Sequence, residues 1–427
     1  MNIKYFNSKI SISLIIISII IFIYILYRNL IYYTESSLQH YYEYYFFSLF
    51  FFIFSILSLF IKENIKINIL LIFLSIIFTF YFIELFLNIF DHTWKRNFSS
   101  KGETKYQLIK KERIKNSKVF SPLSPMIIKV NNEKVFTMSG ISNVQNIHCN
   151  EMGYFSRYKS DKYGFNNPNN NVWMKDTNLE YIIVGDSFAH GNCVNEKDTI
   201  AGNLRKISKE NLINIGYGGS GPLLEYARLL EYFPKEKGVK KILWLFCGEN
   251  DLMDLKIEVK QKILQNYLDE ENFSQDLKSK TKEIDGQLKI FHEKIIQRWK
   301  EESQFNNFLK LQKLRWYILY YMPKNYDYET FKKIMKNVNN FADENNSKLY
   351  FVYIPSDSFV NTKQMFRTEY DEVTKIIKEL NIPIIDIYDE LFKNEKNTKK
   401  YFPPNGKGHY SPLGNQEVAK IIYIKTN

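Results

Sequence analysis

The segment Tyr181-Ile-Ile-Val-Gly-Asp-Ser-Phe188 is the clearest guide to the fold of this chain. Its first four residues are apolar, three of them are β-branched, and the run stops abruptly at glycine, aspartate and serine. Such a run is typical of a buried parallel strand that turns directly into a helix. Because open α/β sheets bind ligands beyond the carboxyl ends of their strands, Ser187 stands where chemistry is expected.

Four further runs of the same kind predict that this strand belongs to one sheet. They span residues 212–215, 242–246, 349–354 and 382–387. Amphipathic patterns lie between the strands, as at residues 199–208, 223–232 and 329–345, so the crossovers are helical. We therefore predict a three-layer α/β/α sandwich with a five-stranded parallel sheet over residues 179–427.

Two regions fall outside this alternation. Residues 119–178 are rich in asparagine, proline and tyrosine and predict loops and short hairpins packed on the core. Residues 255 to about 315 are highly charged and predict a helical insertion after the third strand. This insertion is either a solvated cap or a lid over the site.

Nearly all of the continuous apolar sequence lies before residue 91. Residues 10–27 carry no charge, and a helix of that length covers about 27 Å, close to the hydrocarbon thickness of a bilayer. Residues 44–61 and 67–90 repeat the pattern, so residues 1–90 predict a membrane domain of about three transmembrane helices. Glu84 lies within the third run, where a carboxylate is costly, and should face another helix or the membrane edge.

Two charge signals bear on the orientation of these helices. The segments with Lys4 and Lys9 and with Lys62 and Lys66 are more basic than the segment with Arg28. This bias places the N-terminus in the cytoplasm and the C-terminal domain on the other side of the cytoplasmic (inner) membrane. The basic linker after the third helix favours the opposite side, because such stretches bind anionic head groups of the cytoplasmic leaflet. We expect the extracytoplasmic orientation.

Residues 91–118 form this basic juxtamembrane linker, with nine lysines and arginines against three acids. They hold half of the whole chain's formal charge of +12. Because the excess lies next to the membrane segments and not on a folded face with interleaved aromatics, the expected partners are membrane lipids and not a nucleic acid.

Three cysteines in 427 residues are too few for a disulfide scaffold or a structural zinc cluster, and we expect neither a metal nor a cofactor. Cys149 and Cys193 could bridge the segment before the sheet to the loop just beyond Ser187, if the domain lies outside the cytoplasm. Closing their 43 intervening residues would stabilise the fold by about 4 kcal/mol. Cys247 ends a strand and is interpreted as a small apolar core residue.

Four positions at the ends of strands carry possible chemistry, in the order serine, glycine, asparagine, histidine. Ser187 would present its hydroxyl at the start of a helix, although serine is also a routine helix cap. Gly219 lies in a glycine loop after the second strand, and the Asn250 side chain after the third can donate to an oxyanion. His409 lies in a glycine-flanked loop after the last strand and is badly placed for core packing.

In this order the residues resemble the four blocks of the SGNH/GDSL hydrolase superfamily. The matches are Gly185-Asp186-Ser187 for the nucleophile block, Gly219, five residues after Asn214, for the glycine block, Gly248-Glu249-Asn250-Asp251 for the third and His409 for the last. The resemblance covers residues 180 to about 425.

The resemblance implies acyl transfer through a serine ester. Ser187 Oγ would attack an ester carbonyl while His409 takes its proton and later returns it to the leaving alcohol. The oxyanion would be held by the backbone N–H groups of Ser187 and Gly219 and by the Asn250 side chain, each contributing about 2.7 to 4 kcal/mol. Asp186 would brace the turn.

One position departs from the superfamily pattern. Its members usually carry an aspartate two or three residues before the histidine, whereas this chain has Lys407 and Gly406 there. Losing such a group can cost about 10⁴ in rate in serine proteases. We expect a backbone carbonyl to orient the imidazole instead, with Asp386 and Asp389 as alternatives. His190 is a rival base that should project away from the substrate.

A second motif overlaps the glycine block. Residues 216–221 also read G-x-G-x-x-G between a strand and a helix, which is typical of a dinucleotide site, with Glu249 as the ribose acid. Such a motif normally occupies the first strand-to-helix turn of its domain, whereas this one follows the second strand.

Together these features predict a membrane-anchored serine esterase or O-acyltransferase that acts on acyl groups, above all acetyl, of envelope glycans or of small esters. The glycan assignment rests on analogy with envelope members of the superfamily. A transferase would need a separate membrane acyl-donor protein, because three spans are too few for an acyl channel. The alternatives are an inactive envelope scaffold, which the missing aspartate favours, and a lipid esterase, which the membrane segments favour.

Overall fold

The computed structural model describes residues 3–32, 37–90, 97–174, 178–301, 304–322, 324–362, 367–404 and 408–427. The chain forms two compact units. The helical unit comprises Met1–Phe90 and Gln304–Tyr321, and the sheet unit comprises Asp91–Ser303 and Met322–Asn427.

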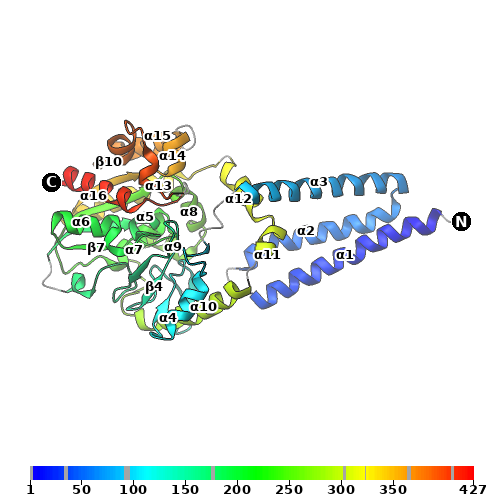
Figure 1. Cartoon of the computed structure of the whole chain (residues 1–427), viewed down its shortest axis with the longest axis horizontal. Helices are drawn as coiled ribbons and strands as arrows, with labels where there is room; N and C mark the ends of the chain where they lie inside the picture. The colour runs from blue at the N-terminus through cyan, green and yellow to red at the C-terminus, as the bar shows by residue number, and fades with distance from the viewer. Residues whose placement is uncertain are drawn as a thin grey trace. The chain divides into compact units, whose positions relative to one another are not determined.

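Three long helices make up most of the helical unit (Figure 1). They are α1 (Ile3–Tyr32), α2 (Ser37–Leu57), which is followed by the short turn η1 (Ser58–Phe60), and α3 (Glu63–Phe90). Each contains a stretch long and apolar enough to cross a membrane, at residues 9–30, 42–60 and 63–90. Most of their large apolar side chains are exposed, which suits helices that face lipid. The prediction of three candidate spans is confirmed.

Polar side chains join the three helices at a few points. Ser55 Oγ of α2 donates to Leu14 O of α1 at 3.3 Å. Lys66 Nζ of α3 donates to Ser11 Oγ of α1 at 2.9 Å. Hydrogen bonds of this kind between helices help to fix which faces of the helices turn toward each other.

Two short helices from the second half of the chain complete the helical unit. They are α11 (Gln304–Leu309) and α12 (Gln312–Tyr321), and both pack on α3. The sequence pattern groups residues 304–315 with the insertion of the C-terminal domain, whereas the structure groups them with the N-terminal helices.

Glu84, the carboxylate inside the third apolar run, lies at the contact between α3 and α12. It is fully buried and accepts the backbone N–H groups of Lys313 and Leu314 at 3.1 and 2.7 Å. Asn88 Nδ2 donates to the same carboxylate at 3.0 Å. Glu84 therefore faces the N-terminus of another helix, one of the two situations expected for it, and that end of a helix favours a negative charge.

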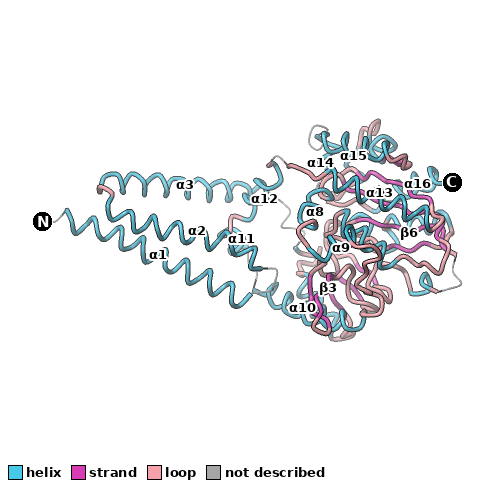
Figure 2. The backbone as a smooth tube through the Cα atoms, turned by 180° about the vertical axis from the view of Figure 1, so that it is seen from behind, coloured by secondary structure: helices cyan, strands magenta, loops and turns pink. Residues whose placement is uncertain are grey.

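The sheet unit is built on five parallel strands in the order β10-β9-β8-β6-β7. Figure 2 shows the strands of this unit in magenta with helices around them. The strands are β6 (Leu179–Gly185), β7 (Leu212–Asn214), β8 (Val239–Cys247), β9 (Lys348–Ile354) and β10 (Ile384–Asp386). Gly185 at the end of β6 is aligned with Leu245 of β8, and Ile183 of β6 with Asn214 at the end of β7. The carboxyl ends of these three strands are therefore neighbours.

Alternate residues of the strands pack into two separate hydrophobic layers. Ile182 and Val184 of β6 belong to the first layer, with the helices α7 (Pro222–Tyr232), α13 (Tyr328–Glu344) and α15 (Arg367–Glu379). Tyr181 and Ile183 belong to the second, with the helices α5 (Ser187–His190), α6 (Ile200–Ser208), α14 (Asp357–Thr362) and α16 (Pro412–Thr426). Strands buried on both faces require this alternation. The predicted three-layer sandwich is confirmed.

The remaining elements surround this core. Residues 97–174 form α4 (Lys105–Arg113), the antiparallel pair β2 (Ile127–Val130) and β3 (Glu133–Phe136), η3 (Asn170–Trp173), and a sheet in the order β1-β4-β5 made of β1 (Val119–Phe120), β4 (Gln145–Ile147) and β5 (Arg157–Lys159). Residues 91–96 of the basic linker lie outside the described part. After β8 come α8 (Asp251–Glu258), α9 (Lys262–Asp269) and α10 (Thr281–Glu301), and short turns lie at η4 (Glu196–Asp198), η5 (Tyr388–Phe392) and η6 (Thr398–Tyr401).

Candidate active site

Ser187 begins α5 immediately beyond the central strand β6. The strand ends at Gly185, whose φ is +147°, and a Cβ there would lie 2.6 Å from Leu245 O. Asp186 caps α5, because its Oδ1 accepts the N–H of Phe188 at 2.9 Å. Ser187 is half-buried, and its Oγ donates to Asp186 Oδ2 at 3.0 Å. The glycine thus permits the sharp turn, and the aspartate braces it.

Asn250 follows β8, on one side of this turn. Its Nδ2 donates to Asp186 Oδ2 at 3.2 Å and to Asp254 Oδ2 at 3.0 Å. Two carboxylates therefore hold the amide in place, and one of them is shared with the hydroxyl of Ser187. Asn250 is half-buried, so its amide lies at the border of the site and not in the core.

The glycine loop follows β7, on the other side of the turn. A Cβ on Gly218 would lie 3.4 Å from Ser187 Cβ, so the loop passes directly beside the serine. Gly219 has a φ of +78° and is exposed. Among the described residues, no acceptor takes the backbone N–H of Ser187 or of Gly219. Both amides can therefore donate to a ligand oxygen, as oxyanion donors must.

His409 comes to the site from the loop before α16. Its ring centroid lies 5.0 Å from that of Phe188, the residue after Ser187. Its Nδ1 lies 3.2 Å from Glu151 Oε2 and 3.3 Å from Oε1, and its backbone N–H donates to Oε2 at 2.8 Å. The Glu151 side chain is only 10% exposed and that of His409 is 22% exposed. The carboxylate thus holds both the main chain and the Nδ1 side of the ring.

Gly408 and a disulfide make this contact possible. The φ of Gly408 is +136°, and a Cβ at that position would lie 2.5 Å from Glu151 Oε2. Cys149 and Cys193 are joined by a disulfide with their Cα atoms 4.7 Å apart. Cys193 Sγ lies 3.9 Å from His409 Nδ1. Because Glu151 is only two residues beyond Cys149, the disulfide also holds the Glu151 carboxylate close to His409.

Glu151 is the residue of the site that sequence analysis missed. We expected a backbone carbonyl to orient His409. This expectation is wrong, because the carboxylate of Glu151 contacts Nδ1. Glu151 belongs to none of the matched motifs and lies outside the alternating strands and helices. Its place two residues after Cys149 is the one signal in the sequence that points to it, and that signal has meaning only once the disulfide is known.

The two aspartates considered as substitutes have other partners. Asp386 Oδ1 accepts the Tyr388 N–H at 2.9 Å, and Asp389 pairs with Lys393 at 3.0 Å. Residues 406 and 407, where the superfamily pattern would place its aspartate, lie outside the described residues.

His190, the rival base, supports the glycine loop instead. It is buried, its Nε2 lies 3.1 Å from Tyr158 Oη, and its Nδ1 accepts the Gly218 N–H at 3.4 Å. Its ring stacks on Tyr217 with centroids 4.6 Å apart. Burial lowers the pKa of His190 to about 3, so the ring is neutral at physiological pH.

Buried acids lie behind the site. Burial raises the pKa of Asp254 to about 6, and it raises the pKa values of Asp251 and Glu225 well above their usual range. The buried Arg228 donates to Gly185 O at 3.3 Å from its Nη1. Burial therefore disfavours the charged forms of Asp251 and Glu225 behind the turn that carries Ser187.

The glycine loop is not arranged for a dinucleotide. The carboxylate of Glu258 accepts the N–H groups of Gly221, Leu223 and Leu224 at 2.5, 3.1 and 3.2 Å. These are the amides at the start of α7 to which a pyrophosphate would bind. A side chain of the protein already occupies that position, which argues against the dinucleotide interpretation of the loop.

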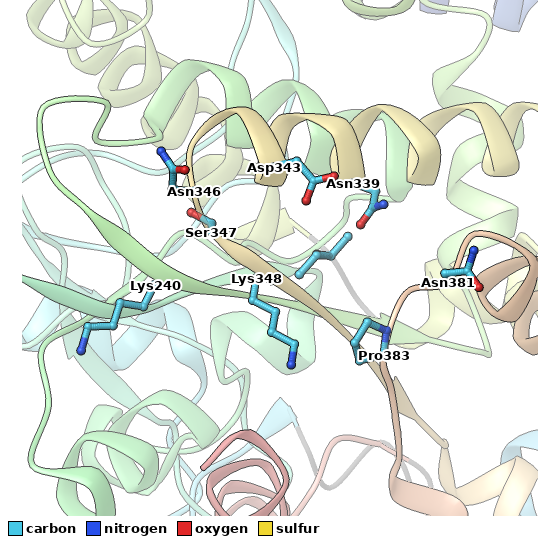
Figure 3. Close-up of a pocket in the computed structure, with 9 residues that line it drawn as sticks. Lys240, Asn339, Asp343, Asn346, Ser347, Lys348, Asn381 and Pro383 are labelled. Carbon is cyan, nitrogen blue, oxygen red and sulfur yellow. The ribbon is translucent and has the colours of Figure 1, made fainter.

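A polar hollow of about 610 Å³ lies at the amino ends of the strands (Figure 3). Its lining includes Lys240 at the start of β8, Lys348 at the start of β9, and Asn339, Asp343 and Asn381. None of these is a candidate site residue. Because open parallel sheets bind ligands at the carboxyl ends of their strands, we place the site at the opposite end.

No protein-family model matches the chain, and no curated protein matches it. Among solved structures it is similar to a lipase/acylhydrolase from Enterococcus faecalis, with 13% identity and a TM-score of 0.35 over 58% of this chain and 94% of that chain. It is also similar to a member of the lipolytic protein G-D-S-L family from Veillonella parvula DSM 2008, with 15% identity and a TM-score of 0.34 over 58% and 97%. An acetyl xylan esterase gives 13% identity and a TM-score of 0.34 over 58% and 100%. At these values no residue role is transferred from them.

Proposed function

We propose that the chain belongs to the SGNH/GDSL hydrolase superfamily and hydrolyses esters through an acyl-enzyme on Ser187. The main support is the convergence of four distant segments at the carboxyl ends of the strands. Ser187 and Asn250 share Asp186 Oδ2, Gly218 lies beside the serine, and the His409 ring packs on the residue after it. A hydroxyl, an imidazole and oxyanion donors are the groups that this chemistry needs.

In the proposed reaction, Ser187 Oγ attacks the ester carbonyl carbon and its proton passes to His409 Nε2. The oxyanion that forms receives hydrogen bonds from the backbone N–H groups of Ser187 and Gly219 and from Asn250. His409 then protonates the leaving alcohol as the C–O bond breaks. A water attacks the acyl-enzyme with His409 as base, which releases the acid and restores the hydroxyl.

Two adjustments accompany substrate binding in this scheme. The Ser187 hydroxyl, which donates to Asp186, turns toward His409. Asn250 Nδ2, which donates to two carboxylates, exchanges one of those bonds for a bond to the oxyanion. The first adjustment is a rotation of the Ser187 hydroxyl, and the second is a change of hydrogen-bond partner at Asn250.

Glu151 acts in this scheme as a positioning residue. A carboxylate on Nδ1 holds the imidazole in the tautomer whose Nε2 can accept a proton, and it stabilises the imidazolium that then forms. Glu151 therefore takes the part that the superfamily's aspartate takes. Its contact with His409 argues against the alternative of an inactive scaffold, because the orienting carboxylate is present, although from another segment.

Labelling with a fluorophosphonate probe tests the proposal. The full-length chain in detergent should be labelled, Ser187→Ala should not be, and Ser279→Ala, an exposed serine on another part of the sheet unit, should be labelled like the wild type. Absence of labelling in a folded wild-type protein would support an inactive scaffold and refute the proposal.

For the substrate and location, we propose acetyl or other small acyl esters of envelope glycans, outside the cytoplasm. The basic bias of the short loops supports this orientation, and so does the Cys149–Cys193 disulfide, since disulfides persist in oxidising compartments. Labelling by a membrane-impermeant probe in intact cells should equal labelling in permeabilised cells. Two alternative activities predict different substrates. Turnover of a phospholipid but not of an acetylated sugar would favour the lipid esterase. An O-acyltransferase would additionally need a sugar acceptor and a separate membrane acyl-donor protein.

A further inference from the structure

α11 and α12 carry an apolar surface that the fold leaves exposed. On α11, Phe305 and Leu309 are 66% and 48% exposed. On α12, Ile318 and Leu319 are 42% and 63% exposed. Exposed apolar side chains grouped on adjoining elements mark an interaction surface more often than a solvated one.

This surface extends around most of α12. Residues 315–319 are all exposed, whereas Leu314, which precedes them, is buried. Trp316 and Tyr317 lie among the exposed residues, and Arg315 adds a positive charge. Tryptophan and tyrosine are enriched where membranes meet water, and basic residues there attract anionic head groups. The composition therefore suits a lipid interface.

The positions at which α11 and α12 contact α3 indicate how deep they lie in the bilayer. α3 has 28 residues and is about 42 Å long, so each end of a centred α3 extends about 6 Å beyond a hydrocarbon layer of about 30 Å. Glu84 is six residues from the end of α3 at Phe90, which places it about 3 Å inside the hydrocarbon boundary. Tyr81, which donates to Leu309 O at 3.0 Å, lies about 7 to 8 Å inside it. Interfacial helices bury their apolar faces to similar depths.

Glu84 holds this segment in place. Its carboxylate accepts two backbone N–H groups at the start of α12, which have no partner within the helix itself. A charged acceptor for these amides removes the cost of leaving them unsatisfied near hydrocarbon. The one carboxylate inside the third apolar run is thus explained by the helix that it caps.

We propose that residues 304–322 form a helical hairpin seated in the lipid interface, a second membrane attachment of the sheet unit, with lipid acyl chains and anionic head groups as its partner. The chain leaves the helical unit after Phe90, returns at Gln304 and leaves again after Tyr321. Three covalent connections therefore tie the sheet unit to the membrane. This arrangement confines the proposed esterase to substrates at the membrane surface more tightly than one linker would.

Fluorescence quenching in proteoliposomes tests the proposal. The full-length Leu319→Cys variant is labelled with an environment-sensitive dye and reconstituted into vesicles of phosphatidylcholine and phosphatidylglycerol. The native cysteines do not interfere, because Cys149 and Cys193 form a disulfide and Cys247 is buried. We expect quenching by lipids with a nitroxide near the head group and protection from aqueous iodide. Ile257→Cys on α8 is the matched control, since Ile257 is 61% exposed and Leu319 is 63% exposed.

The possible outcomes distinguish lipid, water and a second copy of the chain as the occupant of this surface. Iodide quenching at Leu319 equal to that at Ile257 would show a water-exposed surface and overturn the proposal. Protection from both quenchers would show that a second copy of the chain covers the surface, which would overturn the proposal as well.

Phe82→Cys on α3 reports insertion of the spans, and its label should be quenched by nitroxides deep in the acyl chain. Glu84→Ala should make the Leu319 label accessible to iodide while the Phe82 label stays in lipid; an unchanged Leu319 label would refute the role of Glu84.

Discussion

Replacing Glu151 by alanine should reduce ester hydrolysis strongly while leaving the protein folded. The side chain makes two contacts with His409, one to the backbone N–H at 2.8 Å and one to Nδ1 at 3.2 Å. The backbone bond is present throughout the reaction and only positions the loop. The bond to Nδ1 strengthens when the ring takes the serine proton, because the ring then becomes positively charged.

The expected magnitude follows from that second contact. A charge-assisted hydrogen bond is worth about 1.5 to 3 kcal/mol, and a pair of unit charges about 3 Å apart at an effective dielectric constant of about 20 attract by about 5 kcal/mol. Both side chains are largely buried, so solvent screens the attraction only in part. We therefore expect a loss of about 3 to 5 kcal/mol in the transition state, or about 10² to 10⁴ in kcat.

Hydrolysis of p-nitrophenyl acetate by the full-length chain in detergent measures this loss, and thermal unfolding checks the fold. Glu151→Gln should fall between the wild type and Glu151→Ala, since the amide keeps one acceptor oxygen but has no charge. Added formate should restore part of the activity of Glu151→Ala, because it can enter the vacated space as a carboxylate. Glu379→Gln, which breaks an exposed ion pair with Lys332, is the matched control and should be unaffected.

A kcat of folded Glu151→Ala within about threefold of the wild type, less than about 0.7 kcal/mol, would refute the reasoning. A loss of kcat that formate does not relieve and that also occurs in Glu379→Gln would refute it as well. That pattern would indicate a general loss of structure.

Three further predictions follow from the same site. Replacing Cys149 and Cys193 together by alanine should lower the free energy of unfolding by about 4 kcal/mol and reduce kcat, because it releases Glu151; an unchanged Tm would contradict this. Gly408→Ala should lower kcat about as much as Glu151→Ala, since its Cβ would displace the carboxylate, and should add little when Glu151 is already alanine; additive losses would show independent roles. Asp254→Asn should remove one source of pH dependence in the free energy of unfolding. Burial raises the pKa of this carboxyl from 3.8 to about 6, so the native wild-type protein retains a proton that the unfolded chain releases. The stability of the wild type should therefore fall as the pH rises from about 4 to 6. Thermal unfolding across that pH range should show a smaller decline in the variant, and parallel curves would contradict the assignment.

Local patterns in the chain were enough to predict the fold class and the candidate spans. Apolar runs such as residues 181–184 are short, rich in β-branched residues and closed by glycine, and each such feature acts over a few neighbouring residues. The order of the motifs after the strands also placed Ser187, Gly219 and Asn250 at one end of the sheet, because parallel strands present all their carboxyl ends together.

Two contacts depended on the tertiary structure alone. Glu151 meets His409 although 257 residues separate them in the chain, and the approach requires a disulfide, a glycine with positive φ and the packing of two loops. Glu84 meets the start of α12 at Lys313, 229 positions further along the chain. Neither partner can be identified from the periodicity of the sequence, because a carboxylate that contacts a distant segment looks in the sequence like any other acid. The sequence by itself therefore determined the strands, the helices and the candidate nucleophile, whereas only the tertiary structure decided the partners of Glu151 and Glu84, because folding brings distant segments together.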